Sequence, residues 1–145
     1  MRNYFSIQEF IIAPHMRGDG GTIPTHVADK IIQHHLPILN PMRAQLGTPL
    51  IISQHSGYRP VQWELDHGRD GTSQHTFKGK GAVDLTCRES SLHHLGDLLA
   101  ENDYSRVAWY PDHGFYHADF KDYQLGKRLY VVQNGIWKKK DYRTL

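Results

Sequence analysis

Cysteine is almost absent from this chain of 145 residues, because Cys87 is the only one. An internal disulfide and a zinc site built from several thiolates are therefore excluded, and the fold does not depend on an oxidising compartment. Long apolar runs are missing too. The run at residues 10–13 is too short for the hydrophobic region of a signal peptide, and no run approaches the length of a transmembrane helix. We therefore expect a soluble chain that is made in the cytoplasm.

A strong charge of one sign is also lacking. The 17 Lys and Arg residues nearly balance the 15 Asp and Glu residues, which leaves a formal charge of +2. The basic residues are scattered apart from residues 138–140, so the sequence gives no support to nucleic-acid binding. We expect no nucleic-acid or membrane partner and a monomeric protein. A chain of this length has room for one hydrophobic core, so residues 1–145 are expected to form a single domain.

The first half of the sequence is dominated by helical patterns. Ser6 and Glu9 have the spacing of a capping box and predict the start of a short helix. An apolar stripe predicts a longer helix from about residue 25 to residue 46, interrupted by Pro37 and Pro41. Residues 15–21 form a predicted glycine-containing loop. A further helix is expected to begin after Ser90 or Ser91 and to end near residue 101.

The second half is dominated by short runs rich in β-branched and aromatic residues. Asn134 and Gly135 separate the last two runs and are a strong signal for a two-residue hairpin turn. The fold class predicted from this order is α+β, an antiparallel sheet with helices packed on one face. The predicted strands are residues 50–53, 82–85, 106–110, 115–120, 129–133 and 136–138.

The chemistry is concentrated around His75 and Asp84. His75 lies in a polar, glycine-containing loop, and Asp84 lies within an apolar run that predicts a buried strand. A buried carboxylate without a partner is costly, so it protonates, pairs with a cation or binds a metal ion. Hydrogen bonds from backbone amides and an arginine partner are the structural alternatives for Asp84.

His117 is the best candidate for a third ligand. It lies in the predicted strand 115–120, and the period of two places Asp119 on the same face of the sheet. Asp119 is therefore expected to be either a partner behind His117 or a general base. Two imidazoles and a carboxylate with one open position are the ligand set of catalytic zinc, which indicates a hydrolase.

Three further residues are candidates for roles in the reaction. Arg59 lies in a loop bounded by glycine and proline, where its guanidinium fork would bind an anionic end of the substrate. The structural alternative is that Arg59 lies on the surface, stacked on Tyr58 or paired with Asp66. Asp112 and His113 lie in the predicted turn before the His117 strand, from which either would reach an attacking water.

Four short motifs carry a family resemblance. In chain order they are Ser-Gly-Tyr-Arg-Pro at 56–60, Ser-Gln-His-Thr at 73–76, Gly-Ala-Val-Asp-Leu at 81–85 and Tyr-His-Ala-Asp at 116–119. Together they resemble the zinc D-Ala-D-Ala carboxypeptidases and L,D-endopeptidases, most closely the short single-domain members of phage and bacterial genomes. The resemblance implies that His75, Asp84 and His117 bind zinc and that Arg59 orients the substrate. It also implies the α+β fold that these enzymes share with lysostaphin-type peptidases and the hedgehog signalling domain.

The sequence departs from that family in two places. Eight residues separate His75 from Asp84 where six are usual, which a loop can absorb at little cost. Gly114 stands where many members carry the catalytic acid, three residues before the last histidine. The base is therefore expected to be Asp119, Asp112 or His113, with Asp119 ranked first, or the activity is reduced or absent.

The function predicted from the sequence is a zinc-dependent peptidase that cleaves an amide bond in peptidoglycan stem peptides. Because no export signal is present, we expect action on the wall after lysis or as part of a phage particle. The chief alternative is a non-catalytic binding or virion module that keeps zinc for stability. A metal-dependent nuclease is a third reading, disfavoured by the small net charge.

Overall fold

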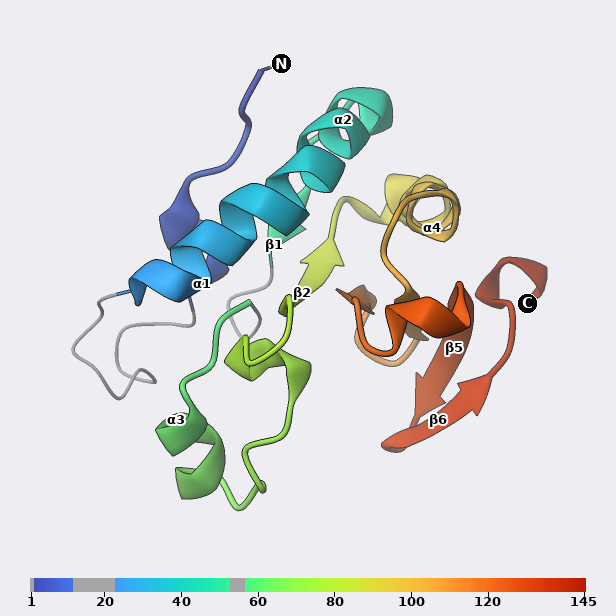
Figure 1. Ribbon diagram of the computed structural model, residues 1–145. Coiled ribbons are helices and arrows are strands. Elements are labelled where there is room, and N and C mark those ends of the chain that lie inside the picture. The colour runs from blue at the N-terminus through green and yellow to red at the C-terminus, as the bar shows by residue number, and fades with distance from the viewer. Residues whose placement is uncertain (1, 12–22, 53–56) are drawn as a thin grey trace.

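The computed structural model describes residues 2–11, 23–52 and 57–145 and contains a six-stranded sheet with several helices (Figure 1). The α+β class predicted from the sequence is therefore confirmed. The predicted loop at 15–21, together with Ser53 and Ser56, lies outside the described residues. The strands are β1 (Ile51–Ile52), β2 (Ala82–Thr86), β3 (Arg106–Tyr110), β4 (Phe115–Asp119), β5 (Arg128–Gln133) and β6 (Ile136–Lys139).

The strand order is β1-β2-β4-β3-β5-β6, and four of the five pairings are antiparallel. The pairing of β3 with β5 is parallel, so the wholly antiparallel sheet expected from the sequence is wrong at this position. The reason is the connection. The chain passes through β4 and the short turn η6 (Tyr123–Leu125) before it returns to the free edge of β3. The sheet is therefore mixed.

The predicted hairpin between β5 and β6 is confirmed. Asn134 and Gly135 both have positive φ, at 54° and 73°, as a type I′ turn requires. The side chain of Trp137, three residues beyond Asn134, is thereby folded back beside the rings of Tyr110 and His117.

The helical segment from residue 25 to residue 46 changes its winding in the middle. It comprises α1 (Thr25–Lys30), a π-helical turn η3 (Ile31–His35) and α2 (Leu36–Leu46). Pro37 has no N–H and its ring crowds the preceding turn, so the sequence predicted an interruption near it. The interruption is a widened turn in which the Leu36 amide bonds to the Ile31 carbonyl.

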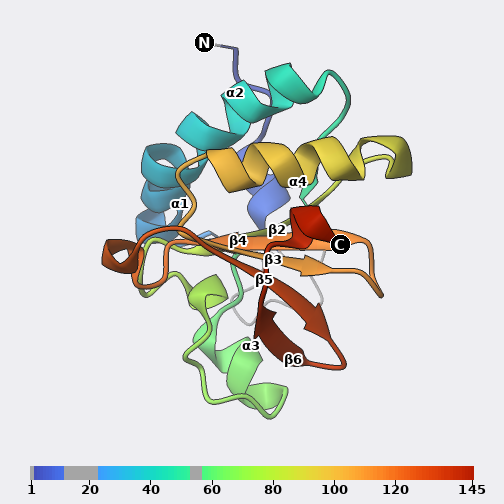
Figure 2. The same cartoon turned by 90° about the vertical axis from the view of Figure 1, so that its right-hand side faces the viewer.

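The helices lie on both sides of the sheet. Figure 2 shows α2 and α4 (Leu92–Glu101) above the sheet and α3 (Val61–Asp66) below it. Leu95, Leu98 and Leu99 of α4 are buried against the core and form the apolar face of an amphipathic helix. The placement of α3 matters for function because it forms one wall of the cavity described below. The expectation of helices on one face alone is therefore wrong for α3.

The loop between His75 and Asp84 is fastened to the helices. The Lys30 ammonium donates to the Phe77 carbonyl at 2.7 Å, and the His35 ring donates from Nε2 to the Lys80 carbonyl at 2.9 Å. His35 is fully buried, and burial lowers its pKa to about 4, so the ring is neutral at pH 7. These contacts give the loop between His75 and Asp84 a defined path.

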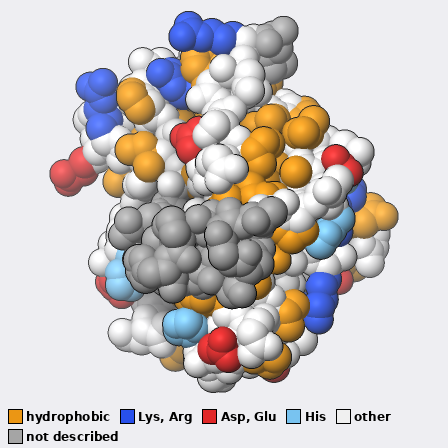
Figure 3. Space-filling model, turned by 90° about the vertical axis from the view of Figure 1, so that its left-hand side faces the viewer, with side chains coloured by type: hydrophobic (Ala, Val, Ile, Leu, Met, Phe, Trp, Pro, Cys, Tyr) orange, Lys and Arg blue, Asp and Glu red, His pale blue; other side chains and the backbone are white. Residues whose placement is uncertain are grey.

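The remaining short helical turns are η1 (Ile7–Phe10), η4 (Gln74–Thr76), η5 (Glu89–Ser91) and η7 (Tyr142–Thr144). The capping box predicted at Ser6 and Glu9 is present, with the Ser6 amide bonded to the Glu9 carboxylate at 2.6 Å. Within the described ranges, no helix is both long enough and apolar enough to cross a membrane. Figure 3 shows basic, acidic and histidine side chains scattered among hydrophobic ones over the described part of one face.

Candidate metal centre

The sheet register brings Asp84 and His117 together. Residues 84 and 117 are directly paired in the antiparallel ladder between β2 and β4, and both side chains are buried. Side chains of directly opposite residues project on the same face of a sheet and lie close together. The Asp84 Oδ1 to His117 Nδ1 distance is accordingly 2.9 Å.

His75 reaches the same place from the loop that precedes β2. It sits in the single turn η4, where the Ser73 hydroxyl accepts a hydrogen bond from the His75 amide. The next turn of chain is sharp, because Phe77 has a φ of 59°. The His75 ring donates from Nδ1 to the Gly57 carbonyl at 2.8 Å, so its Nε2 faces Asp84 and His117.

The spacing of the three inner ligand atoms fits a small divalent cation. His75 Nε2 lies 3.2 Å from His117 Nδ1 and 3.4 Å from Asp84 Oδ1. A tetrahedral zinc ion with ligands at about 2.0–2.1 Å needs neighbouring ligand atoms about 3.3 Å apart. Within the described residues, these three form the one group of this kind that could hold a metal ion.

In each histidine ring, the nitrogen that faces away from the cluster already donates a hydrogen bond. His75 donates from Nδ1 to Gly57, and His117 donates from Nε2 to the Asp119 carboxylate at 2.6 Å. In each neutral ring the inner nitrogen then carries a lone pair. Two lone pairs and a carboxylate oxygen therefore converge on one point, which is the donor chemistry of a cation site.

The electrostatics show that a metal ion must displace a proton from His117 when it binds. Burial lowers the pKa of His75, although the Asp84 charge acts in the opposite direction. Burial alone would also lower the pKa of His117, but hydrogen bonds to Asp119 and Asp84 outweigh it and raise the pKa to about 9. The pKa of Asp84 lies well below its usual range, because the imidazoles outweigh the cost of burial. Asp84 is therefore an anion, and protonated His117 is its cationic neighbour at pH 7 until a metal ion takes the place of that proton.

Asp119 lies behind His117. Its carboxylate accepts from His117 Nε2, and it also pairs with the Arg106 guanidinium through Nε at 2.9 Å and Nη2 at 2.5 Å. The register explains this pair, since Arg106 and Asp119 are opposite each other in the ladder of β3 with β4. Asp119 is fully buried, and the Lys121 amide donates to its second oxygen at 2.9 Å.

Arg59 lies on the other side of the cluster. Its Nη2 is 3.9 Å from Asp84 Oδ2, and its Nη1 is 3.5 Å from Glu64 Oε1. The sequence alternative of a pair with Asp66 is wrong, because Asp66 instead accepts from the Gln62 side chain at 2.8 Å. Arg59 is therefore a half-buried arginine held near the metal-binding cluster.

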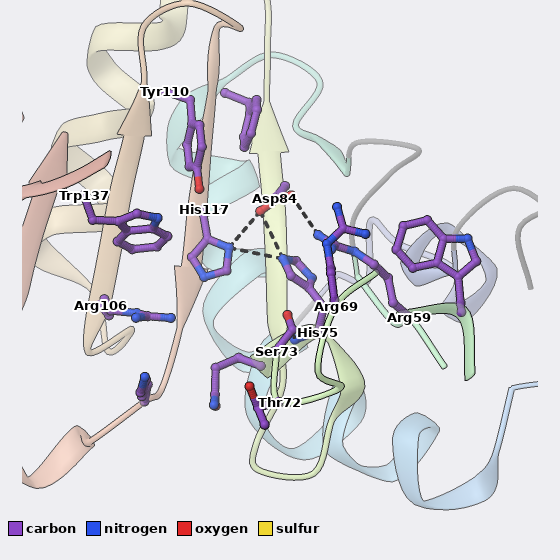
Figure 4. A pocket seen from close by; sticks show the side chains of 14 residues that line it. Arg59, Arg69, Thr72, Ser73, His75, Asp84, Arg106, Tyr110, His117 and Trp137 are labelled. Carbon is purple, nitrogen blue, oxygen red and sulfur yellow. Dashed lines mark hydrogen bonds and ion pairs between the residues drawn. The ribbon is translucent and has the colours of Figure 1, made fainter. Parts of the chain in front are cut away.

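The cluster forms the floor of a cavity of about 600 Å³. Figure 4 shows Trp137 and Arg106 on one side of His117 and Asp84, and Arg59 and Arg69 on the other side. The exposed turn residues Asp112 and His113 are not among those that line the cavity, and neither is Asp119. The lining residues are Arg59, Trp63, Arg69, Thr72, Ser73, Gln74, His75, Asp84, Arg106, Tyr110, Phe115, His117, Lys121 and Trp137.

Sequence reasoning overlooked several of these lining residues. The sequence predicts mostly loop over residues 61–72, with one helical turn around residues 63–65, whereas the structure has the helix α3 over residues 61–66. Trp63 lies in this helix, and Arg69 follows it. The sequence did contain a signal for turns around Arg69, because Gly68 and Gly71 flank it, and both glycines have positive φ in the structure. Tyr110 and Trp137 were recognised only as strand residues, since nothing in the sequence shows that these strands meet at the cluster.

The fold and the site together define a class: a mixed α+β protein with a His-Asp-His cluster suited to one metal ion. The comparison with protein families agrees, because the family model described as Peptidase M15 matches residues 3–119. The chain belongs to the peptidase M15 family, which is the zinc D-Ala-D-Ala carboxypeptidase family that the motifs resemble. Membership implies a zinc metallopeptidase. Searches of curated proteins and of solved structures gave no significant match.

Proposed function

We propose that this protein is a zinc-dependent peptidase that hydrolyses an amide bond in peptidoglycan stem peptides, as a D-Ala-D-Ala carboxypeptidase or an L,D-endopeptidase. One observation carries the proposal. Two imidazole nitrogens and a carboxylate oxygen, 2.9 to 3.4 Å apart, converge in the floor of a cavity in a chain of the M15 family. We include in the proposal a single domain over residues 1–145 with a hedgehog-like arrangement, and action on the wall after lysis or from a phage particle.

The proposed ligands are His75, Asp84 and His117. Lewis-acid activation of the scissile carbonyl and of the attacking water is the chemistry that zinc supplies in such a site. Gly57 fixes the orientation of the His75 ring through its carbonyl. Arg59, held by Glu64, would bind a substrate carboxylate with its guanidinium fork.

Asp119 is proposed to orient His117 rather than to act as the general base. Its two oxygens already accept from His117, Arg106 and the Lys121 amide, which leaves little capacity to take a proton from water. The pKa of Asp119 also lies well below its usual range, because the hydrogen bonds and charges of His117 and Arg106 outweigh the cost of burial. A carboxylate behind a ligating histidine fixes its tautomer and strengthens it as a ligand.

The Asp119→Asn variant tests this role. Asn keeps an oxygen acceptor for His117 but removes the charge and leaves Arg106 without its partner, so zinc affinity should fall by about ten- to a hundredfold. The measurement is competition with a fluorescent zinc chelator. Asp103→Asn, an exposed change outside the cavity, is the control. An unaltered affinity in Asp119→Asn would exclude the orienting role and return Asp119 to the candidates for the base.

Asp112 and His113 remain the proposed candidates for the base. Both are exposed in the turn between β3 and β4, so substrate binding would have to bring one of them over the cavity. This requirement predicts slow turnover relative to family members that carry an acid in the site.

The direct test of the proposed function is hydrolysis of purified muropeptides before and after removal of zinc. Activity should be lost on chelation and restored by about one equivalent of zinc, as followed by mass spectrometry of the products. Cleavage that continues at the same rate in chelator would reject the mechanism. Cleavage absent from the zinc-loaded protein would reject the peptidase itself.

A second candidate is a non-catalytic binding module that retains zinc for stability. The observation in its favour is that Asp84 is the only carboxylate lining the cavity within the described residues, and Asp84 is needed as a ligand. This module would bind zinc and lose stability on chelation without hydrolysing any muropeptide.

A further inference from the structure

We propose that the α3 side of the cavity binds a part of the substrate that carries two carboxylates, one taken by Arg59 and the other by Arg69. The inference rests on the proposed function only in treating the His75–Asp84–His117 cluster as the reacting centre. The chemical class of ligand is a peptide with a dicarboxylic residue on the α3 side of that centre.

The first step is a charge imbalance around Glu64. This carboxylate is fully buried, and its two oxygens lie 3.5 Å from Arg59 Nη1 and 3.3 Å from Arg69 Nε. Two guanidinium groups therefore share one anion. Asp84 is 3.9 Å from Arg59 but is occupied by the two histidines, so it does not restore the balance. A partly buried positive surplus of this kind favours an anionic ligand.

The second step is the number of unused donors. Among the described residues, four buried side-chain nitrogen or oxygen atoms make no hydrogen bond, and three of them belong to this group: Arg59 Nε, Trp63 Nε1 and Glu64 Oε2. Trp63 is itself 7 % exposed and lines the cavity. Two of the three atoms are N–H donors, which suit a ligand with acceptor oxygens.

The third step is the rigidity of the two guanidinium groups. Arg59 and Arg69 both lie over the Trp63 ring, with their Cζ atoms 5.6 and 5.1 Å from its centroid. The Arg69 amide also donates to the Glu64 carbonyl at 2.9 Å, which folds the chain back across α3. Arginine forks held in place bind carboxylates with little further loss of freedom.

The fourth step is the depth of the two groups. The Arg59 side chain is 14 % exposed and lies beside Asp84, whereas the Arg69 side chain is 49 % exposed. Apart from the ion pair with Glu64, the Arg69 side chain makes no hydrogen bond or ion pair with the part of the chain that is described. One carboxylate is therefore expected close to the metal-binding cluster, and the second towards the mouth of the cavity.

The opposite wall does not offer the same arrangement. Arg106 also lines the cavity, but Asp119 neutralises it and accepts hydrogen bonds from its Nε and Nη2. Lys121 is an exposed cavity-lining cation without a guanidinium fork. It provides a matched control for a general effect of positive charge.

The experiment uses isothermal titration calorimetry to measure how tightly the zinc-loaded protein binds two probes that resist hydrolysis. The probes are the acetylated ketomethylene isosteres of D-Ala-D-Glu and D-Ala-D-Gln, which have two carboxylates and one. The wild-type protein should bind the dianionic probe roughly tenfold more tightly, as one charge-assisted pair provides. Arg69→Gln should reduce this ratio to less than about threefold, Arg69→Lys should retain part of it, and Lys121→Gln should leave it unchanged.

Two results would overturn the inference. One is a ratio near one in the wild-type protein, and the other is an equal loss of the ratio in Arg69→Gln and Lys121→Gln. The proposed function is tested separately by muropeptide hydrolysis. A preserved preference for the dianionic probe without hydrolysis would leave this binding site standing and reject the peptidase.

Discussion

Replacing Asp84 with Asn should abolish both zinc binding and peptide hydrolysis. The substitution keeps the shape of the side chain but removes the one negative charge that lies between His75 and His117. Residues that hydrogen-bond to a metal ligand usually contribute a factor of about ten to a hundred to metal affinity. Loss of a ligand itself should have a larger effect and lower kcat/KM by at least about a thousandfold. Zinc affinity and muropeptide hydrolysis are measured on the same preparations.

The control for this variant is Asp29→Asn, which removes an equal charge from an exposed position on α1. Circular dichroism in the presence of a chelator establishes that Asp84→Asn still folds. Full activity in a folded Asp84→Asn protein would show that the reaction does not use this cluster.

Replacing Gly57 with Ala should produce the largest loss of stability that we predict for a single methyl group. Gly57 has a φ of 85°, and an added Cβ would lie 2.2 Å from the Phe10 carbonyl oxygen. The two backbone segments are held together at this point, since the next amide, that of Tyr58, donates to the same Phe10 oxygen at 2.6 Å. Left-handed strain and a backbone clash together should lower the free energy of unfolding by about 3–5 kcal/mol.

The same change should also disturb the reaction, because the Gly57 carbonyl fixes the His75 ring. Urea unfolding with zinc in excess measures the stability, and chelator competition measures the affinity for zinc. Gly47→Ala is the matched control: its φ is 73°, but an added Cβ meets nothing within 4 Å, so it should cost only about 1 kcal/mol. Equal losses in the two variants would show that the Phe10 contact is unimportant.

The three residues of the cluster were predictable because each lies in a strong local pattern. Asp84 and His117 stand in strands marked by β-branched and aromatic runs, and His75 stands in a loop between polar residues and glycine. The register that places residue 84 opposite residue 117 follows once these strands pair. Sequence periodicity also placed Asp119 on the face of His117, which its hydrogen bond to that ring confirms.

The rest depended on tertiary placement, which local patterns do not contain. The ladder between β3 and β5 is parallel because the chain leaves the end of β4 and passes the start of β3 to reach the other edge of β3, and no turn signal specifies which strand edge it reaches. Nothing in the sequence joins Arg106 to Asp119 until β3 and β4 are in register. Arg69 and Glu64 form their pair only because α3 is a helix and the chain folds back after it.

X-ray diffraction at the zinc absorption edge, from crystals grown with zinc, tests the central claim most directly. The account predicts one anomalous peak about 2.0–2.2 Å from His75 Nε2, His117 Nδ1 and an Asp84 oxygen. Absence of any peak between these three side chains, in crystals that contain zinc elsewhere, would contradict it.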